Sequence, residues 1–196
     1  MRNILLLLSI CTLFLIPGCD KIKSALERDV EVSDVDFESE EMEAFPETGE
    51  PSGNPDEQSE IFYSFKEVQS LSLDEFEGAS TLKKYSSNLI KSVSVEEAAI
   101  IIIPNPDAAG TVKEFKATVE GITPYTIEGD YALGTVHRTG MKEFIEKVLF
   151  QILITKDSKP EGLQMTIEGK TNLPESVKLK ARIQIKGIKV KVQLMS

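Results

Sequence analysis

The stretch VKLKARIQIKGIKVKVQL, residues 177–194, alternates apolar and polar side chains along almost its whole length. Successive side chains of a strand point to opposite faces of a sheet, so this alternation predicts β-structure with one buried face. The phase of the alternation flips at Gly187. Either a tight hairpin or a glycine bulge there keeps both apolar sets on one face, and we favour the hairpin because a single strand of about 18 residues would be unusually long.

Further strands are predicted upstream of this stretch. Runs rich in apolar and β-branched residues are separated by turn-forming prolines, asparagines and glycines, which is typical of antiparallel β-structure. Residues 99–103 read AIIII and have no polar alternation, so we expect them to be buried on both faces. The predicted strands cover residues 61–71, 95–103, 112–120, 125–133 and 163–168.

One segment has the spacing of an α-helix instead. Its apolar residues recur at i, i+3, i+4, i+7, i+8 and i+11, which predicts a helix over residues 141–153 that Thr139 could cap. A weaker stripe predicts a possible second helix over residues 80–92. Together these patterns predict a mainly β domain of the β-rich α+β class, an antiparallel β-sandwich-like fold of about seven strands with one or two packed helices. The apolar stripe of the first helix consists of Met141, Phe144, Ile145, Val148, Leu149 and Ile152.

The charge of the chain is unevenly distributed. Residues 20–60 carry 15 acidic and three basic side chains, a net charge of −12, whereas residues 61–196 carry 17 acidic and 18 basic ones. Three prolines and few large apolar residues accompany the acidic groups, so a compact core there is entropically unfavourable. We therefore predict a disordered acidic tether over residues 19–60 and a single β-rich globular domain over residues 61–196.

A calcium site in this acidic segment is the alternative that we considered. Asp34, Asp36, Glu38 and Glu40 alternate along the chain, and carboxylates suit a hard cation. An EF-hand loop, however, requires a turn glycine and a terminal glutamate at set positions, and both are missing here. We interpret the segment as a solvated linker, and we expect no metal site and no cofactor.

The chain begins with a short basic start and a 13-residue apolar stretch, residues 4–16. This is the length of a signal-peptide core and is shorter than the roughly 20 residues that a spanning helix requires. The following residues, Ile16-Pro17-Gly18-Cys19, resemble the lipobox of bacterial lipoproteins, although Pro17 departs from the commoner small residue at its position. An ordinary secretory signal with a coincidental cysteine, or a transmembrane anchor, are the competing interpretations.

The lipobox resemblance implies that residues 1–18 are a signal peptide and that Cys19 receives a diacylglyceryl group and becomes the mature N-terminus. Each buried methylene contributes about 0.8 kcal/mol, so two or three acyl chains hold a protein durably on a membrane. We therefore expect a lipid-anchored protein of the bacterial cell envelope. Asp20 resembles an inner-membrane retention signal of enterobacterial lipoproteins, but early acidic residues accompany surface display elsewhere, so both membranes remain open.

Few residues of the chain are suited to catalysis. Beyond Cys19 there is no cysteine, and His137 is the only histidine, which we interpret as a loop residue. Ser80-Thr81-Leu82-Lys83 matches the S-x-x-K motif of penicillin-binding proteins, and Lys170-Thr171-Asn172 approximates their K-T-G motif. On a helix Lys83 would lie one turn from Ser80 and could activate it. That family's domain is about twice as long, however, and Asn172 replaces a glycine.

The last strands carry six basic and no acidic side chains between Val177 and Ser196. Nucleic acid is an implausible partner for an exported acidic chain without interleaved aromatic residues on these strands. The basic residues either form a solvated strand face that guards an edge or contact an anionic partner, namely headgroups, polysaccharide or the protein's own acidic tether.

These observations lead to three hypotheses about function. We favour a non-enzymatic binding or structural module at the cell envelope, attached to the membrane by its lipid, with an envelope protein or a polysaccharide as its possible partner. The second hypothesis is a carrier of a lipid or other hydrophobic ligand, in which helix 141–153 covers an apolar cavity. The third is a small envelope hydrolase that uses Ser80 and Lys83.

Overall fold

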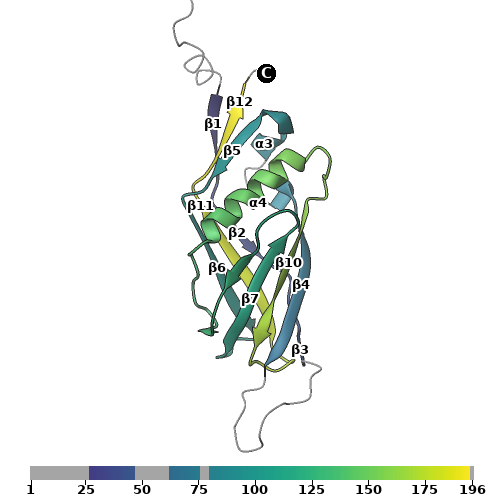
Figure 1. Ribbon diagram of the computed structural model, residues 1–196, viewed down its shortest axis with the longest axis vertical. Coiled ribbons are helices and arrows are strands. Elements are labelled where there is room, and N and C mark those ends of the chain that lie inside the picture. Colours follow the sequence, from purple (N-terminus) through teal and green to yellow (C-terminus); the bar gives the residue numbers. More distant parts are fainter. Residues whose placement is uncertain (1–26, 47–61, 76–79, 195–196) are drawn as a thin grey trace, which may run out of the picture.

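The computed structural model describes residues 27–46, 62–75 and 80–194 (Figure 1). These residues form strands β1 to β12 in three antiparallel sheets, together with a long helix, α4. The domain therefore has the β-rich α+β architecture with sandwich-like layers that the alternation predicted.

Three long segments of the chain each run through two of the sheets. In the first sheet β12 (Ile188–Gln193) lies between β1 (Glu27–Val32) and β5 (Ile90–Ser94). In the second sheet β11 (Lys178–Lys186) lies between β2 (Val35–Glu38) and β6 (Glu97–Asn105). Strands β11 and β12 follow one another in the chain but pair with different partners. The predicted hairpin is therefore wrong, and the chain bends at Gly187 instead.

The bend at Gly187 has a clear physical cause. Its φ is +63°, a left-handed conformation that costs a residue with a Cβ about 1–2 kcal/mol. A Cβ there would also lie 2.4 Å from Cγ of Glu96. One left-handed residue shifts the phase of the side chains, so Ile185 and Ile188, on either side of the bend, are both 3% exposed. The glycine thus keeps both apolar sets in the core without reversing the chain.

The acidic segment contradicts its predicted disorder where it can be described. Residues 27–46 form β1, β2 and β3 (Ala44–Pro46) and belong to the folded domain. Their apolar side chains alternate with the acidic ones, and Val32, Val35, Met42 and Ala44 are buried. The energy of burial, the strand pairing and the opposite charge of β11 and β12 together outweigh the self-repulsion that suggested disorder. The remaining tether residues, 19–26 and 47–60, lie outside the described residues.

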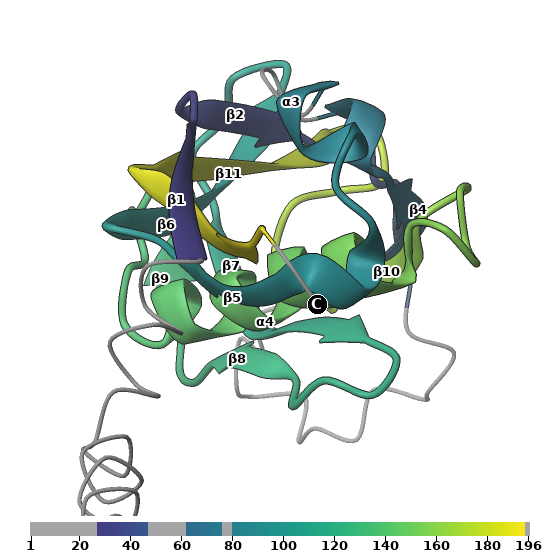
Figure 2. The same ribbon diagram turned by 90° about the horizontal axis from the view of Figure 1, so that it is seen from above.

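A larger sheet packs against the β2-β11-β6 sheet (Figures 1 and 2). Its order is β3-β4-β10-β7-β8, and a short β9 also pairs with β7. The predictions at 61–71, 112–120 and 163–168 are confirmed, and the last of these strands is longer than expected. The predicted strand 125–133 is divided into β8 and β9 by a turn at Gly129, where φ is +80°. The bounds are β4 Tyr63–Leu71, β7 Thr111–Val119, β8 Tyr125–Ile127, β9 Tyr131–Ala132 and β10 Leu163–Thr171.

Strand β6 confirms the strand predicted over residues 95–103, but the predicted burial of residues 99–103 on both faces is confirmed only in part. Ile100 and Ile102 are fully buried, but Ile101 and Ile103 on the other face are half-buried. The apolar run therefore marks one core face and one partly covered face.

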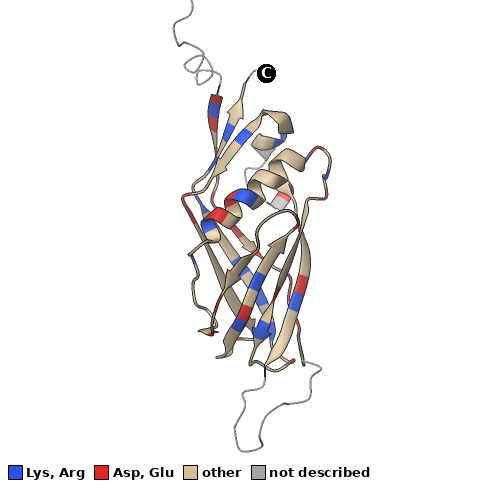
Figure 3. Cartoon of the chain, viewed as in Figure 1, with Lys and Arg blue, Asp and Glu red and all other residues tan. Residues whose placement is uncertain are grey.

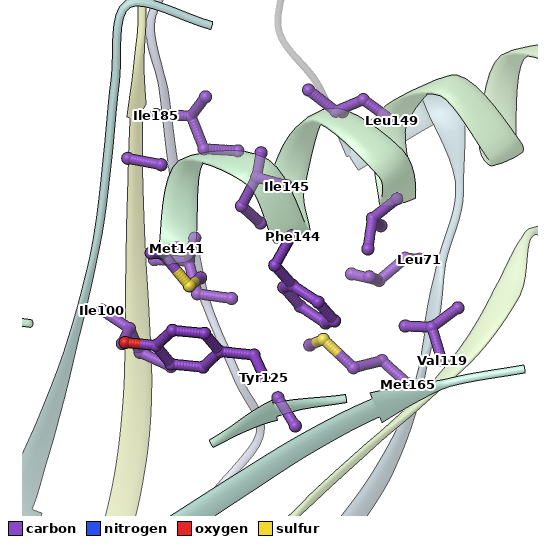
Figure 4. Close-up of a cluster of buried hydrophobic side chains, with 14 of the residues drawn as sticks. Leu71, Ile100, Val119, Tyr125, Met141, Phe144, Ile145, Leu149, Met165 and Ile185 are labelled. Atoms are coloured by element: carbon purple, nitrogen blue, oxygen red, sulfur yellow. The ribbon is translucent and has the colours of Figure 1, made fainter. Parts of the chain in front are cut away.

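Helix α4 (Met141–Thr155) confirms the predicted helix and packs against β5 and β6. Its apolar side chains point into the space between the sheets, where Phe144 and Met165 lie side by side (Figure 4). Thr139 does not cap the helix, because the N-cap residue is Gly140 in a left-handed conformation and no side chain caps it. All six residues of the predicted stripe are at most 5% exposed.

The second predicted helix, over residues 80–92, does not form. That region contains a single turn, α3 (Ser80–Lys83), then a 3-10 turn (Ser87–Leu89) and strand β5. The serines that diluted the helical stripe favour local turns over a continuing helix. Ile90 is buried as the first residue of β5 rather than as part of a helix face.

Candidate functional site

The structure separates the two halves of the penicillin-binding-like motif. Lys83 forms an ion pair with Asp74 and lines the same surface hollow as Gly162, just before β10. Lys170 lies eight residues after Gly162 along the extended strand. At roughly 3.3 Å per residue, this places Lys170 about 26 Å from Gly162. Lys170 pairs with Glu114 at 3.0 Å. The fold therefore places the K-T-G-like motif, which begins at Lys170, far from Lys83.

The helix covers closely packed apolar side chains of the described residues. Met141 is completely buried, Phe144 is 4% exposed, and the ring of Phe144 lies 5.9 Å from that of Tyr125. Side chains of α4, of the larger sheet and of the β2-β11-β6 sheet belong to one continuous apolar cluster (Figure 4). The carrier hypothesis depended on a cavity beneath this helix, and the close packing removes its main support.

The lone histidine closes a sheet edge. His137 exchanges two backbone hydrogen bonds of 2.9 Å with Ile100 of β6, and its ring meets that of Tyr131 edge-on at 4.2 Å. Burial lowers the pKa of His137 and raises that of Tyr131. The imidazole Nε2 and the Tyr131 hydroxyl are buried without a hydrogen-bond partner in the described part of the chain. The sequence placed this histidine in a loop and missed its bridging contact.

The basic last strands lie against the chain's own acidic segment. Arg182 donates a hydrogen bond of 2.8 Å from Nε to Glu38 of β2, and Lys178 lies 3.3 Å from Glu43. At the other end of the same segments Lys191 lies 3.7 Å from Glu27 of β1. Blue and red positions accordingly alternate across these strands (Figure 3). Of the anionic partners considered for the basic run, the structure provides the protein's own N-terminal segment.

A groove opens at the side of the sandwich, between β2 of one sheet and β4 of the other. Its volume is about 590 Å³. One rim is acidic and the other, on β4, includes Val68, a large apolar side chain that is 50% exposed. Glu38 is paired with Arg182, whereas Asp36 and Glu40 have no ion pair with any described residue. The lining residues are Asp36, Phe37, Glu38, Glu40, Val68, Gln69 and Ser70.

One local feature of the sequence marks this groove, the phase of the side chains along β4. Along β4 the inward positions are Phe65, Glu67, Gln69 and Leu71, so Val68 is an apolar residue in the outward phase. Gln69 points inward, and its side-chain nitrogen is buried without a described acceptor. The outward Val68 and the inward Gln69 reverse the usual alternation, in which apolar side chains point inward and polar ones outward. Both residues line the groove.

A second hollow, of about 450 Å³, lies on the outer face of the larger sheet. It is centred on a bulge where Glu114 of β7 has a φ of +56°, which is uncommon for a residue other than glycine. Glu168 lies 3.7 Å from Lys66 and 3.5 Å from Lys116. These opposite charges neutralise one another across the strands, so the hollow has little net charge to attract a ligand.

Cys19, the predicted site of lipidation, lies outside the described residues. Comparison of the chain with protein-family models, curated proteins and solved structures gives no match. Within residues 27–46, 62–75 and 80–194, no helix has the length and apolar character to cross a membrane. The same residues contain no group of three or more His, Cys, Asp or Glu side chains arranged to hold a metal ion.

Proposed function

We propose that this chain is a lipid-anchored protein of the bacterial cell envelope whose β-sandwich domain is a non-enzymatic binding module. The anchor is the Cys19 thiol, as the lipobox resemblance of residues 16–19 implies. The binding surface is the side groove between β2 and β4. The observation that carries the binding role is this groove, which combines an exposed apolar residue with unpaired carboxylates between two strand edges.

The start of β1 supports one placement of the domain relative to such an anchor. Glu27 begins β1 only eight residues after Cys19, and eight residues span at most about 29 Å. The domain is therefore held close to the membrane surface rather than at the end of the tether predicted over residues 19–60. The end that carries β1, β5 and β12 faces the membrane, and the end at β3 points away from it (Figure 1).

The competing hypotheses have weaker support. A hydrolase would need a base close to Ser80, but Lys83 is engaged by Asp74 and Lys170 lies at the far end of β10. A carrier would need a cavity, and the core beneath α4 is filled. A binding module needs neither, because an open groove and a rigid scaffold suffice.

The anchor is tested by substituting each of the two cysteines in the full-length gene. Cys19→Ala should leave an unprocessed precursor without a diacylglyceryl group, whereas Cys11→Ala, the matched control, should be lipidated and processed normally. Membrane fractionation and mass spectrometry of the N-terminal peptide provide the readout. A mature N-terminus at any residue other than Cys19 would contradict the proposal.

A further inference from the structure

Part of β4 is an open strand edge. On one side β4 pairs with β10 along its whole length, from Tyr63 to Leu71. On the other side β3 pairs only with Tyr63, Ser64 and Phe65, at the lower end of the strand (Figure 1). Residues 66–71 therefore have no strand beside them in the described part of the chain. The backbone N–H and C=O groups of such an edge are a template for another extended segment.

The other edges of the described sheets are covered, short or charged; the edge strand β1, for example, reads ERDVEV. The outer side of β6 is covered by the backbone of the segment around His137, through the bonds to Ile100 and one of 2.9 Å from Gly134 to Ile102. At the far side of the larger sheet, β8 and β9 are only three and two residues long. Natural proteins protect edges in these ways, or with charged residues and prolines. The open part of β4 begins with the charged Lys66 and Glu67, but its last four residues, Val68-Gln69-Ser70-Leu71, contain no charged residue and no proline.

The uncompensated charges across the groove from this edge have one sign, and on β4 itself Lys66 is paired with Glu168. Across the groove the carboxylates of Asp36 and Glu40 are exposed, and neither has a cationic partner among the described residues. Glu38 between them is neutralised by Arg182. A segment that lies along β4 therefore meets two uncompensated negative charges on one side and the exposed Val68 on the other. In an extended strand alternate side chains can satisfy both rims.

We propose that residues 66–71 of β4 accept an extended, basic segment of a partner protein, which adds a strand to the sheet and directs its cationic side chains to Asp36 and Glu40. The main-chain hydrogen bonds supply affinity, and the acidic rim and Val68 select alternating basic and apolar side chains. This inference names the partner of the binding module proposed above and rests on that function. It does not depend on the lipid anchor.

Two other occupants fit the groove less well. Residues 47–61 of the chain itself carry five acidic and no basic side chains, so their charge is wrong for an acidic groove. A second copy of the chain brings a net charge of −10. The carboxylates of Asp36 and Glu40 repel both of these acidic occupants, and they attract a basic segment.

The probe is a fluorescein-labelled peptide of five Lys-Val repeats, added to the full chain purified in detergent. A peptide of five Glu-Val repeats is the charge control. We expect saturable binding of the basic peptide that weakens at high salt, and slower amide exchange at residues 66–71 upon binding. Val68→Lys and the double variant Asp36→Lys/Glu40→Lys should each weaken binding at least about tenfold, because about 1.4 kcal/mol of lost contact corresponds to a factor of ten.

Val136→Lys is the matched control, since Val136 is also an exposed valine, at 40%, and lies away from the groove. It should bind the peptide as the unmodified chain does. Circular dichroism melting of each variant separates loss of binding from loss of fold. Failure of the basic peptide to bind, equal binding of the acidic peptide, or protection of amides elsewhere would overturn the proposal. Self-association of the chain that is lost in the Val68→Lys variant would also overturn it, because this result would assign the β4 edge to a second copy of the chain. None of these results alters the outcome of the Cys19 experiment.

Discussion

The backbone N–H of Gly187 donates a hydrogen bond of 3.0 Å to a carboxylate oxygen of Asp34, which lies 153 residues earlier in the chain. Beside it, the N–H of Glu96 donates to the carbonyl of Lys186 at 3.0 Å. These contacts lie where all three long segments pass from one sheet to the next. The bend is thus a single structural feature, built by residues from three distant parts of the sequence.

The bend at Gly187 should be sensitive to any side chain. Gly187→Ala meets both the left-handed backbone and the Glu96 side chain, and should lower the free energy of unfolding by about 2 kcal/mol or more. Gly121→Ala is the matched control, because Gly121 has a φ of +77° but no atom within 4 Å of the added Cβ. It should cost only about 1–2 kcal/mol. Urea denaturation of both variants makes the comparison, and an equal loss would argue against the steric role of Glu96.

The ion pair between Glu38 and Arg182 ties the acidic segment to the last strand. Both side chains are about two-fifths exposed, so the pair contributes only about 0.2–1 kcal/mol. Arg182→Glu alone should destabilise the domain, and Glu38→Arg added to it should restore most of the loss. The coupling should shrink in high salt, because salt screens exposed charges. A double-mutant cycle by urea denaturation at two salt concentrations measures it, and a vanishing coupling at low salt would contradict the pairing.

The core beneath α4 should respond as a filled one. Phe144→Ala removes a ring that is 4% exposed and should lower the free energy of unfolding by about 3–5 kcal/mol. The exposed Phe45→Ala, with a ring that is 53% exposed, is the control and should cost far less. If the unmodified protein instead bound an apolar fluorescent probe in its interior and Phe144→Ala cost little, a ligand cavity would have to be reconsidered.

Acid should destabilise the domain through His137. Burial lowers its pKa in the folded protein below the ordinary value of about 6.5 that it regains on unfolding. The unfolded chain therefore binds more protons between the folded pKa and about 6.5, and stability falls as the pH drops through that window. Above about 6.5 this contribution is constant. His137→Phe should flatten the pH dependence between about 5 and 7 in thermal melts, and an unchanged slope would exclude His137 as its source.

The proposed lipidation of Cys19, only eight residues before the start of β1, predicts an orientation on the membrane. Because the folded part has no cysteine, single labels can be placed at Leu194, beside β12, and at Asp107, beyond the far end of β6. A fluorophore at Leu194→Cys should be quenched strongly by headgroup-labelled lipids in vesicles that carry the lipidated protein. The same label at Asp107→Cys should be quenched little. Equal quenching would indicate a domain that is free to reorient.

Several elements could be predicted because their signals are local. The alternation of residues 177–194 and the spacing of the 141–153 stripe each lie within one continuous segment, so they predicted strands and a helix that the structure contains. Charge was the misleading signal. Residues 27–46 were judged by their own like charges, although their apolar side chains alternate with the acidic ones. Their stability comes from burial of those apolar side chains, from strand pairing with β11 and β12, and in smaller part from ion pairs to residues about 150 positions away, and these distant partners leave no local pattern.

The candidate groove was not predicted for the same reason. Val68 could have been noticed as an apolar residue in the outward phase of β4, but Asp36 and Glu40 come from a segment that the sequence alone assigned to a linker. By itself the sequence determined the strand-forming alternation and the long helix, because each depends on neighbouring residues; the lipobox resemblance at Cys19 is equally local and stays a proposal. Only the tertiary structure decided that Gly187 bends a continuous segment, that the acidic strands neutralise the basic ones, and that residues 66–71 of β4 have a neighbouring strand on one side only among the described residues, because these depend on which distant segments pair.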